Sequence, residues 1–304
     1  MNTKAAIRSL RLRTLPLSTG GVLLGILLAW VAVLPQFWTA LLILLTTICL
    51  QIVSNLSNEL GDVLHGTDTA ERQGPAYGLN GGELTVADMK KLIVTFVVLS
   101  IVFGTAMTWV AFGTLLSWKA LGVLLLGACA IAAALCYTLG SHPYGYRGLG
   151  DLFVFIFFGL VAVLGAMFIC YGGQNLFFAK DLLPAAGVGF FSVGVLNVNN
   201  TRDMRTDAAT RTTVALKLGL HGARVYQTVL IVLGWVCMIS YCLLCWGSVW
   251  HWVWVLTIPL YIKHLRIFWT CEGHGLDRAL PLLVNATFLL CLLMGLGFLS
   301  FQLF

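Results

Sequence analysis

Long runs of apolar residues, separated by short polar segments, dominate this chain. A helix needs about 20 mostly apolar residues to cross the hydrocarbon core of a bilayer, and several of the runs reach that length. Of all residues, 59% are hydrophobic and 10% are charged, whereas a typical soluble domain has about 25% charged residues. A water-soluble fold of this size cannot bury so much apolar surface. The sequence therefore predicts a polytopic membrane protein.

The fold class predicted from these runs is all-α, a bundle of about nine transmembrane helices in a single domain covering residues 1–304. No segment alternates apolar and polar residues as the strands of a membrane barrel do. The expected spans are 15–34, 37–58, 92–112, 120–139, 149–171, 182–199, 224–245, 249–262 and 279–303.

The basic residues give the expected orientation of the bundle. With nine spans, one side holds the N-terminus and the loops after every second span, and it carries all of the 18 Lys and Arg except Lys119 and Lys180. The positive-inside rule places this side in the cytoplasm. The net charge of +6 is therefore interpreted as a topology signal, and no nucleic-acid partner is expected.

The acidic residues fall on the same side, although the positive-inside rule does not predict this. All of the 12 Asp and Glu except Asp181 lie there. They include two clusters, each at the cytoplasmic end of a span and each preceded by amides. Their spacings of three, four and seven place residues on one face of a helix. The clusters are Asn55, Asn58, Glu59 and Asp62, followed by Asp68, and Asn200, Asp203 and Asp207.

Two facing carboxylate clusters repel each other unless cations lie between them. Hard oxygen ligands of this kind suit Mg²⁺, which commonly bridges protein carboxylates and substrate phosphates. Arg72, Arg202 and Arg211 are placed to bind phosphate oxygens. The alternative interpretation is that the clusters cap helices in a solvated loop. Polar groups at membrane depth are costly, so the paired clusters favour a site for an amphiphile with a diphosphate head group.

A third group of residues follows the fourth span, in a loop rich in glycine and aromatic residues. It contains Tyr137, Tyr144, Tyr146, Arg147 and Asp151. Its aromatic rings and arginine suit a pocket for a ring or for an allylic cation. The alternative is a belt of interfacial tyrosines.

These motifs resemble the UbiA superfamily of intramembrane aromatic prenyltransferases, in particular the branch that prenylates 1,4-dihydroxy-2-naphthoate in menaquinone biosynthesis. The resemblance runs from Arg11 to Gly219. The family's N-D-x-x-D motif is similar to Asn58-Glu59-x-x-Asp62, and its second acidic motif is similar to Asp203 to Asp207. The runs 144–151 and 68–75 resemble the naphthoate branch. Glu59 replaces a usual Asp, Arg13 a usual Lys, and Tyr77 and Asn80 a common Arg and Gln.

The resemblance implies a bundle around a lipid-open cavity, capped by cytoplasmic loops near 59–91 and 200–223. It implies transfer of a polyprenyl chain from polyprenyl diphosphate to dihydroxynaphthoate, with loss of CO₂ and diphosphate, giving demethylmenaquinone. The implied location is a bacterial cytoplasmic (inner) membrane with the site on the cytoplasmic side, where membrane lipid is a partner and Mg²⁺ the cofactor. The expected metal ligands are Asn58, Glu59, Asp62, Asp68, Asp203 and Asp207. The expected catalytic residues are Asp62, Asp203, Asp207, Arg72, Arg147 and Asp151. The expected substrate-binding residues are Arg11, Arg13, Asn55, Asn58, Arg72, Tyr137, Tyr144, Tyr146, Arg202 and Arg211.

Three other functions fit parts of the pattern. Another prenyltransferase of the superfamily, for example one acting on 4-hydroxybenzoate, would share the paired acidic clusters. A membrane transporter would place ionisable groups near the bilayer midplane, whereas here they gather at one boundary. A lipid-head-group binder would need the basic residues more than the acids.

Overall fold

The computed structural model describes residues 2–67 and 75–303, with the side chains of 301–303 left out of the description. Within this part of the chain the fold is helical, and its only β-pairing is a single bridge between Arg147 and Thr212. The predicted all-α fold is confirmed. The helices are α1 (Thr3–Ser9), α2 (Leu15–Trp30), α3 (Phe37–Leu64), α4 (Val86–Phe112), α5 (Trp118–Cys136), α6 (Gly150–Val154), α7 (Ala162–Cys170), α8 (Leu182–Arg202), α9 (Met204–Asp207), α10 (Val214–Leu244), α11 (Ile258–Thr270) and α12 (Ala279–Leu303). The π-helical segment Phe155–Val161 joins α6 to α7, and the 3₁₀ segments Val249–Thr257 and Gly273–Arg278 precede α11 and α12.

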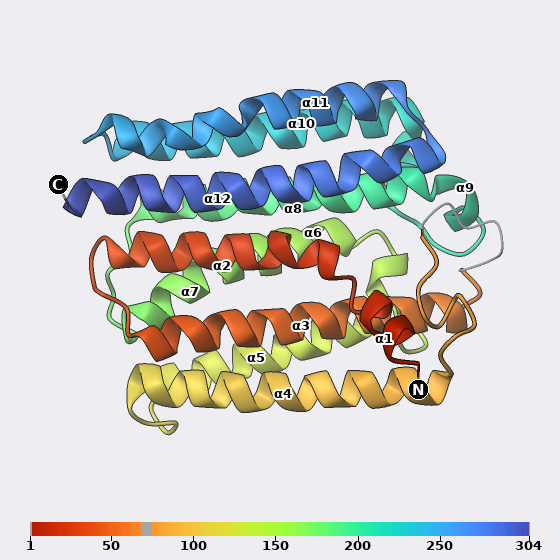
Figure 1. Ribbon diagram of the computed structural model, residues 1–304, viewed down its shortest axis with the longest axis horizontal. Helices are drawn as coiled ribbons and strands as arrows, with labels where there is room; N and C mark the ends of the chain where they lie inside the picture. Colours follow the sequence, from red (N-terminus) through yellow and green to blue (C-terminus); the bar gives the residue numbers. More distant parts are fainter. Residues whose placement is uncertain (1, 68–74, 304) are drawn as a thin grey trace.

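Eight helical stretches of the described chain are long and apolar enough to cross a membrane. The expected span at 249–262 is not one of them. This region is helical from Val249 through Thr270 and lies along α10 and α12 (Figure 1). It also contains His264, Lys263 and Arg266, which make it more polar than the other passages.

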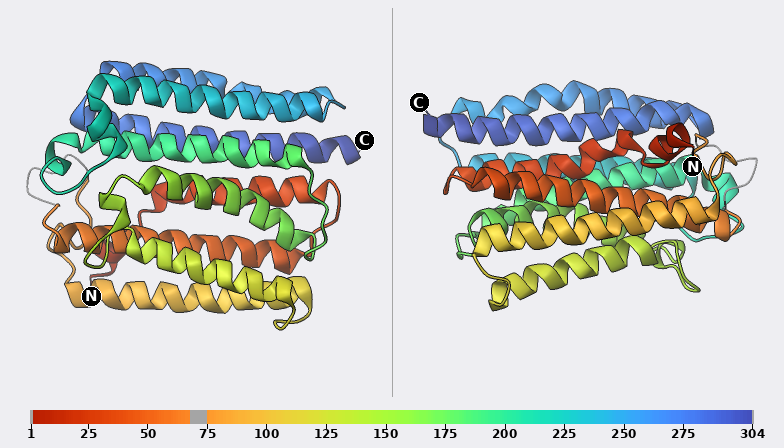
Figure 2. Two further views of the ribbon diagram at one scale, coloured as in Figure 1. Left: turned by 180° about the vertical axis from the view of Figure 1, so that it is seen from behind. Right: turned by 60° about the horizontal axis from the view of Figure 1, so that its bottom comes forward.

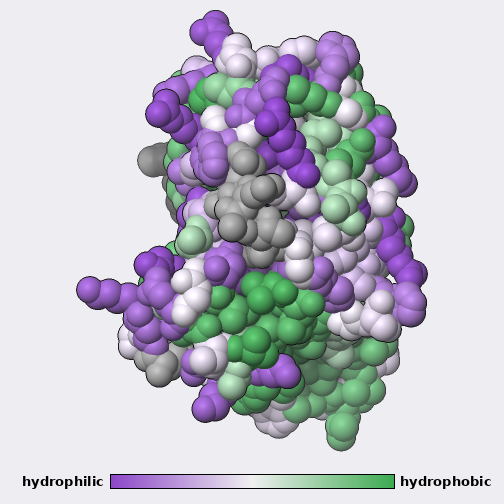
Figure 3. Space-filling view, turned by 90° about the vertical axis from the view of Figure 1, so that its right-hand side faces the viewer, coloured by the Kyte–Doolittle hydropathy of each residue, from purple (hydrophilic) through white to green (hydrophobic). Residues whose placement is uncertain are grey.

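The helices run side by side along the long axis of the molecule, with α10 and α11 at one edge and α4 at the other (Figure 1). The N-terminus and the loops after α3, α5 and α8 lie together at one end, and Figure 2 shows the same grouping from two further sides. We call this end the polar end, because hydrophilic side chains cover much of it (Figure 3). The polar end comprises residues 2–14, 65–67, 75–85, 137–149, 203–213 and 271–278.

The central helices are held together by close backbone contacts at small residues. Gly159, in the π-helical segment, lies directly against Gly189 of α8. A Cβ atom on Gly159 would lie 2.6 Å from Gly189 Cα and 2.7 Å from the Ala185 carbonyl oxygen. The π-helical segment and α8 therefore approach more closely than two helices with side chains at this position can.

Replacing Gly159 with alanine is expected to destabilise the protein by about 1–3 kcal/mol, the usual cost of overpacking a well-packed interior. Thermal unfolding of the purified protein in one detergent measures this. Gly122→Ala is the matched control, because a Cβ there meets no atom within 4 Å. Equal melting temperatures for the two variants would contradict the packing argument.

Helix α5 differs from its neighbours in being almost unburied, with Ala120 as its one buried residue. It packs against α3 and α4 on one side. Its small residues Gly127, Ala130, Ala133 and Ala134 line a cavity between the helices. The rest of α5 therefore faces the surroundings of the bundle, which for a membrane protein are lipid.

Candidate functional site

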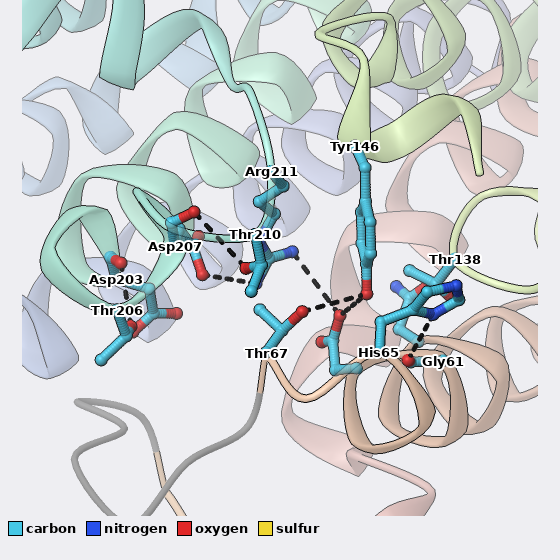
Figure 4. A network of polar contacts seen from close by, with 12 residues as sticks. Gly61, His65, Thr67, Thr138, Tyr146, Asp203, Thr206, Asp207, Thr210 and Arg211 are labelled. Carbon is cyan, nitrogen blue, oxygen red and sulfur yellow. Dashed lines mark hydrogen bonds and ion pairs between the residues drawn. The ribbon is translucent and has the colours of Figure 1, made fainter. Parts of the chain in front are cut away.

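The two acidic clusters meet at the polar end, although about 140 residues separate them in the chain. Asp62 lies in the last turns of α3, Asp203 follows α8 directly, and Asp207 ends the short helix α9. Arg211 connects the two clusters: its Nη2 is 2.7 Å from Asp207 Oδ1 and its Nη1 is 3.7 Å from Asp62 Oδ1. Figure 4 shows Arg211 pointing from the segment after α9 toward α3.

These acids surround a polar cavity of about 80 Å³. We call it the polar cavity. Its lining combines carboxylates, amides and arginines from α3, α8, α9 and the loops of the polar end. The lining residues are Arg11, Arg13, Thr14, Asn58, Asp62, Tyr77, Tyr137, Thr138, Leu196, Asn199, Asn200, Arg202, Asp203, Asp207, Arg211 and Leu280.

One carboxylate of the polar cavity, that of Asp207, is destabilised in its charged form. Burial raises the pKa of Asp207 to about 6, and the neighbouring Asp203 and Asp62 act in the same direction, whereas the charge and hydrogen bond of Arg211 oppose the rise. A buried carboxyl whose charged form is disfavoured gains most from an added cation. The polar cavity is therefore suited to a positive ion.

The two arginines beside the acids are already engaged. Arg202 is buried and donates from Nε and Nη2 to the two carboxylate oxygens of Asp203, at 2.9 and 2.6 Å. Its Nη1 donates to Asp277 at 3.0 Å. Arg211 lies over the ring of Tyr146 as well as between the acids. Both cations thus partly balance the carboxylates and hold them in place.

Tyr146 attaches the loop after α5 to the first acidic cluster. Its hydroxyl donates to Asp62 Oδ1 at 2.7 Å and accepts from Thr67 Oγ1 at 3.4 Å, and its ring packs edge-on against His65. Burial, followed by the charge of Asp62, raises the pKa of Tyr146, so it remains a hydrogen-bond donor. The loop is therefore part of the site and not a belt at the membrane surface.

A second cavity, of about 320 Å³, extends from the polar cavity between the helices. We call it the apolar cavity. Helix α3 lines it from Ile43 to Asn58, which at 1.5 Å per residue is about 22 Å. An aromatic row forms one wall near its mouth: Tyr144 stacks on Phe153 with ring centroids 4.1 Å apart, and Phe153 faces Phe157. Six residues line both cavities: Arg11, Thr14, Asn58, Tyr137, Leu196 and Asn199.

A polar cavity rich in carboxylates that continues into an apolar cavity suits an amphiphile with an anionic head, as the sequence motifs predicted. The sequence profile of the UbiA prenyltransferase family matches residues 19–289. The chain belongs to the UbiA prenyltransferase family.

Relatives within the UbiA family cover nearly the whole chain. The 1,4-dihydroxy-2-naphthoate octaprenyltransferase of Escherichia coli (strain K12) is 36% identical over 87% of this chain and 84% of its own length. The protein of that name from Haemophilus influenzae (strain ATCC 51907 / DSM 11121 / KW20 / Rd) is 35% identical over 94% of both chains. The apo structure of a UbiA homolog from Aeropyrum pernix K1 shares the fold, with a TM-score of 0.69 at 16% identity, covering 99% of this chain and 98% of that one.

Of the residues singled out by the UbiA resemblance, three lie away from the cavities. Arg147 is exposed and lines neither cavity. Asp151 accepts a 2.8 Å hydrogen bond from the hydroxyl of Tyr226 on α10 and also lines neither. Glu59 is fully buried, and its Oε1 accepts from the backbone N–H of Leu79 at 2.7 Å. None of these three lines either cavity, and their expected catalytic and metal-binding roles stay predictions.

The other expected UbiA site residues fall into three groups. Asp68 and Arg72 lie outside the described residues. Asn55 and Tyr144 line the apolar cavity, while Tyr146 contacts the site through Asp62. The remaining ones line the polar cavity: Arg11, Arg13, Asn58, Asp62, Tyr137, Arg202, Asp203, Asp207 and Arg211.

The structure also brings residues to the polar cavity that the sequence motifs did not single out. Asn199 lies in the amide run just before Asp203, beside Asn200 of the predicted cluster, and both line the cavity. The position of Asn199 at the membrane end of an acidic motif was a usable signal. Tyr77 comes from the loop after α3. Its only sequence signal was that it departs from the usual residue at that position in the UbiA family.

The oxygen donors around the polar cavity fit a hard divalent cation. Asn58, Asp62, Asp203 and Asp207 supply amide and carboxylate oxygens from two helices, the ligand type that Mg²⁺ prefers. Among the described residues, no three acidic, histidine or cysteine side chains are close enough together to hold a metal by themselves. Mg²⁺ in proteins commonly uses one or two carboxylates together with water and substrate phosphates.

Proposed function

We propose that this chain transfers a polyprenyl group from polyprenyl diphosphate to 1,4-dihydroxy-2-naphthoate, with loss of CO₂ and diphosphate. The observation that carries the proposal is the junction of the two cavities. It places an anionic head group among carboxylates and arginines while an apolar tail runs between the helices. The names of the relatives from Escherichia coli and Haemophilus influenzae support the acceptor and a long prenyl chain.

The diphosphate occupies the polar cavity and the prenyl chain the apolar cavity, so that the first prenyl carbon lies at their junction. Asn58, Asp62, Asp203 and Asp207 would hold Mg²⁺, which would supply positive charge to offset that of the leaving diphosphate. Arg211 lies between Asp62 and Asp207 and holds both carboxylates in position. Groups arranged in advance around developing charge usually lower the activation barrier more than any other catalytic effect does.

The reaction is an electrophilic substitution on the aromatic ring. The bond between the first prenyl carbon and oxygen breaks, and its electron pair leaves with the diphosphate. The aromatic row of Tyr144, Phe153 and Phe157 shields the resulting allylic cation from water and stabilises it through the ring faces. The ring carbon that carries the carboxylate attacks the cation. Loss of CO₂ then returns the electron pair to the ring and yields the quinol form of demethylmenaquinone.

The polar end faces the cytoplasm in this proposal, and the protein resides in a bacterial inner membrane. The concentration of Lys and Arg at that end supports the orientation. The relatives named above come from bacteria, which supports the assignment to a bacterial membrane. The donor and the product stay in the bilayer, while the acid and the diphosphate exchange with the cytoplasm.

Dihydroxynaphthoate labelled in its carboxyl carbon is expected to release the label as CO₂ in a one-to-one ratio with diphosphate. The two ring hydroxyls make the substituted carbon electron-rich enough to attack, and decarboxylation restores aromaticity without a strong base. Trapped CO₂ and released diphosphate are measured from the same reaction. Label retained in the prenylated product would assign the chain to a hydroxybenzoate-like reaction. No transfer to any aromatic acid would contradict the proposed function.

A further inference from the structure

Two arginines of the polar cavity, Arg11 and Arg13, differ from the others in their partners. They come from the connection between α1 and α2, and among the described residues neither forms an ion pair with a carboxylate. Arg11 Nε and Nη2 are buried and make no hydrogen bond. Buried guanidinium nitrogens without acceptors are costly. Arg11 and Arg13 therefore provide the positive charge left for an anion from outside the protein.

One aromatic side chain, Tyr77, holds both arginines. The guanidinium of Arg11 lies 4.1 Å from the centroid of the Tyr77 ring, and Nη2 of Arg13 donates to the Tyr77 hydroxyl at 2.7 Å. Tyr77 itself is buried, with 7% of its surface exposed. A ring fixed in this way restricts the positions available to two long and otherwise flexible side chains.

The backbone of Tyr77 is fixed by a compact turn. The Tyr77 N–H donates to the side-chain oxygen of Asn80 at 2.6 Å, and the Gly81 N–H closes the turn on the Tyr77 carbonyl at 3.0 Å. Glu59 accepts from the N–H of Leu79 and, at 3.4 Å, from that of Asn80. The buried Glu59 carboxylate therefore attaches the Tyr77 turn to α3.

The turn is also clamped to α1, and Arg11 has its own supports. The N–H of Gly78 donates to Ser9 Oγ at 3.0 Å. Arg11 is the one non-glycine described residue with a positive φ, at 51°, a conformation that is uncommon for such residues. It is held by Thr14 Oγ1, which donates to the Arg11 carbonyl at 2.9 Å, and by Asn55 Nδ2, which donates to the preceding carbonyl at 2.8 Å. Strained backbone of this kind persists where the surroundings determine it and is frequent at binding sites.

We propose that Tyr77 is a positioning residue that orients Arg11 and Arg13 to bind the carboxylate of the aromatic acceptor, and that Glu59 fixes the Tyr77 turn for this purpose. The inference rests on the proposed function and deepens it. It assigns an acceptor subsite to the α1–α2 connection and gives Glu59 a role other than metal binding.

The carboxylate of the acceptor fits this subsite better than the diphosphate does. Arg11 lines both cavities and is next to the neutral Thr14 and Asn55, so an anion there needs no metal ion to offset nearby acids. The diphosphate instead belongs beside Asp62, Asp203 and Asp207. A planar carboxylate also matches the fork of a guanidinium.

Removing the ring is expected to weaken binding of the acid selectively. In Tyr77→Leu, the KM for dihydroxynaphthoate and the Kd of 1-hydroxy-2-naphthoate, measured by protein fluorescence, should both rise about tenfold, as loss of a desolvated cation–π contact allows. The KM for polyprenyl diphosphate and the Kd of 1-naphthol, which lacks the carboxylate, should stay within about twofold. Tyr77→Phe keeps the ring and loses the Arg13 acceptor, so a rise of about threefold is expected, typical of one hydrogen bond.

Two further variants complete the test. Glu59→Leu should raise the KM for the acid as Tyr77→Leu does and leave the Mg²⁺ concentration for half-maximal rate unchanged. Arg8→Gln is the matched control, because Arg8 lies on α1 and its ion pair with Glu83 is exposed; it should change neither Kd. Thermal unfolding checks that each variant is folded, and Tyr77→Phe carries the test if Tyr77→Leu does not fold.

Three results would overturn the positioning role. They are unchanged binding of the acid in both Tyr77 variants, equal losses for 1-hydroxy-2-naphthoate and 1-naphthol, and a rise confined to the KM for the diphosphate. A change in the Mg²⁺ concentration for half-maximal rate in Glu59→Leu would indicate that Glu59 is a metal ligand and would overturn its proposed role in fixing the turn. The binding assay needs no turnover. If the Tyr77 variants weaken binding of the acid as expected but the wild-type protein transfers no prenyl group, only the proposed function is contradicted.

Discussion

Alanine in place of Asp62 or Asp203 is expected to lower kcat at least about a hundredfold, the usual result of removing one charge-stabilising element from a preorganised site. Asp62→Ala removes the carboxylate that contacts both Tyr146 and Arg211. Asp203→Ala leaves the buried Arg202 with Asp277 as its remaining carboxylate partner. In both variants the positive charge around the diphosphate loses a fixed partner. Rates of prenyl transfer at saturating substrates measure the effect.

The matched control is Glu272→Ala, because Glu272 is an exposed acid at the same end of the molecule. It should retain nearly the rate of the wild type. Membrane insertion and thermal unfolding establish that each variant is folded. Folded Asp62→Ala or Asp203→Ala proteins with near-normal rates would show that other carboxylates serve the reaction.

Thorough chelation with EDTA is expected to abolish turnover, and added Mg²⁺ to restore it. The three carboxylates of the polar cavity repel a diphosphate, and Arg202 and Arg211 are committed to balancing them. Without a divalent cation, repulsion from these carboxylates prevents the diphosphate from binding in the polar cavity. Prenyl transfer is assayed before chelation, after it, and after Mg²⁺ is returned.

EDTA already saturated with Mg²⁺ serves as the control for effects of the chelator on the membrane or detergent. It should leave the rate unchanged. Full activity in metal-free conditions would exclude Mg²⁺ from the mechanism and leave the arginines as the only cations for the leaving group.

The fold could largely be predicted from the sequence, because apolar length is a local property. Eight of the nine expected spans are helices long and apolar enough to cross a membrane. The segment 249–262 shows the limit of that reasoning, since its helix continues to Thr270 through charged residues. The meeting of the two acidic clusters also followed from the sequence, because each ends an apolar span on the same side.

Side-chain direction was harder to predict. Asn55, Glu59 and Asp62 share a helix face by spacing, but at about 100° per residue Glu59 lies about 60° from Asp62 around the axis. That angle is enough to turn Glu59 to the loop, where two backbone N–H groups bind it. Tyr77 and Arg13 are 64 positions apart, so no local spacing reveals their contact. The path of a glycine-rich loop depends on what it packs against, so the sequence could not show that Arg147 and Asp151 lie outside both cavities.

Through helix α5, the thickness of the lipid bilayer affects the shape of the apolar cavity. The 19 residues of this helix span about 28 Å, close to the roughly 30 Å of a hydrocarbon core, and α3 and α4 support only one side of it. A thinner or thicker membrane is accommodated by tilting or shifting such a helix. Because the small residues of α5 form one wall of the apolar cavity, a mismatch between helix length and bilayer thickness alters the space available to the prenyl chain. Enzyme taken from its membrane into short-chain detergent should therefore differ in chain preference from the same enzyme in vesicles.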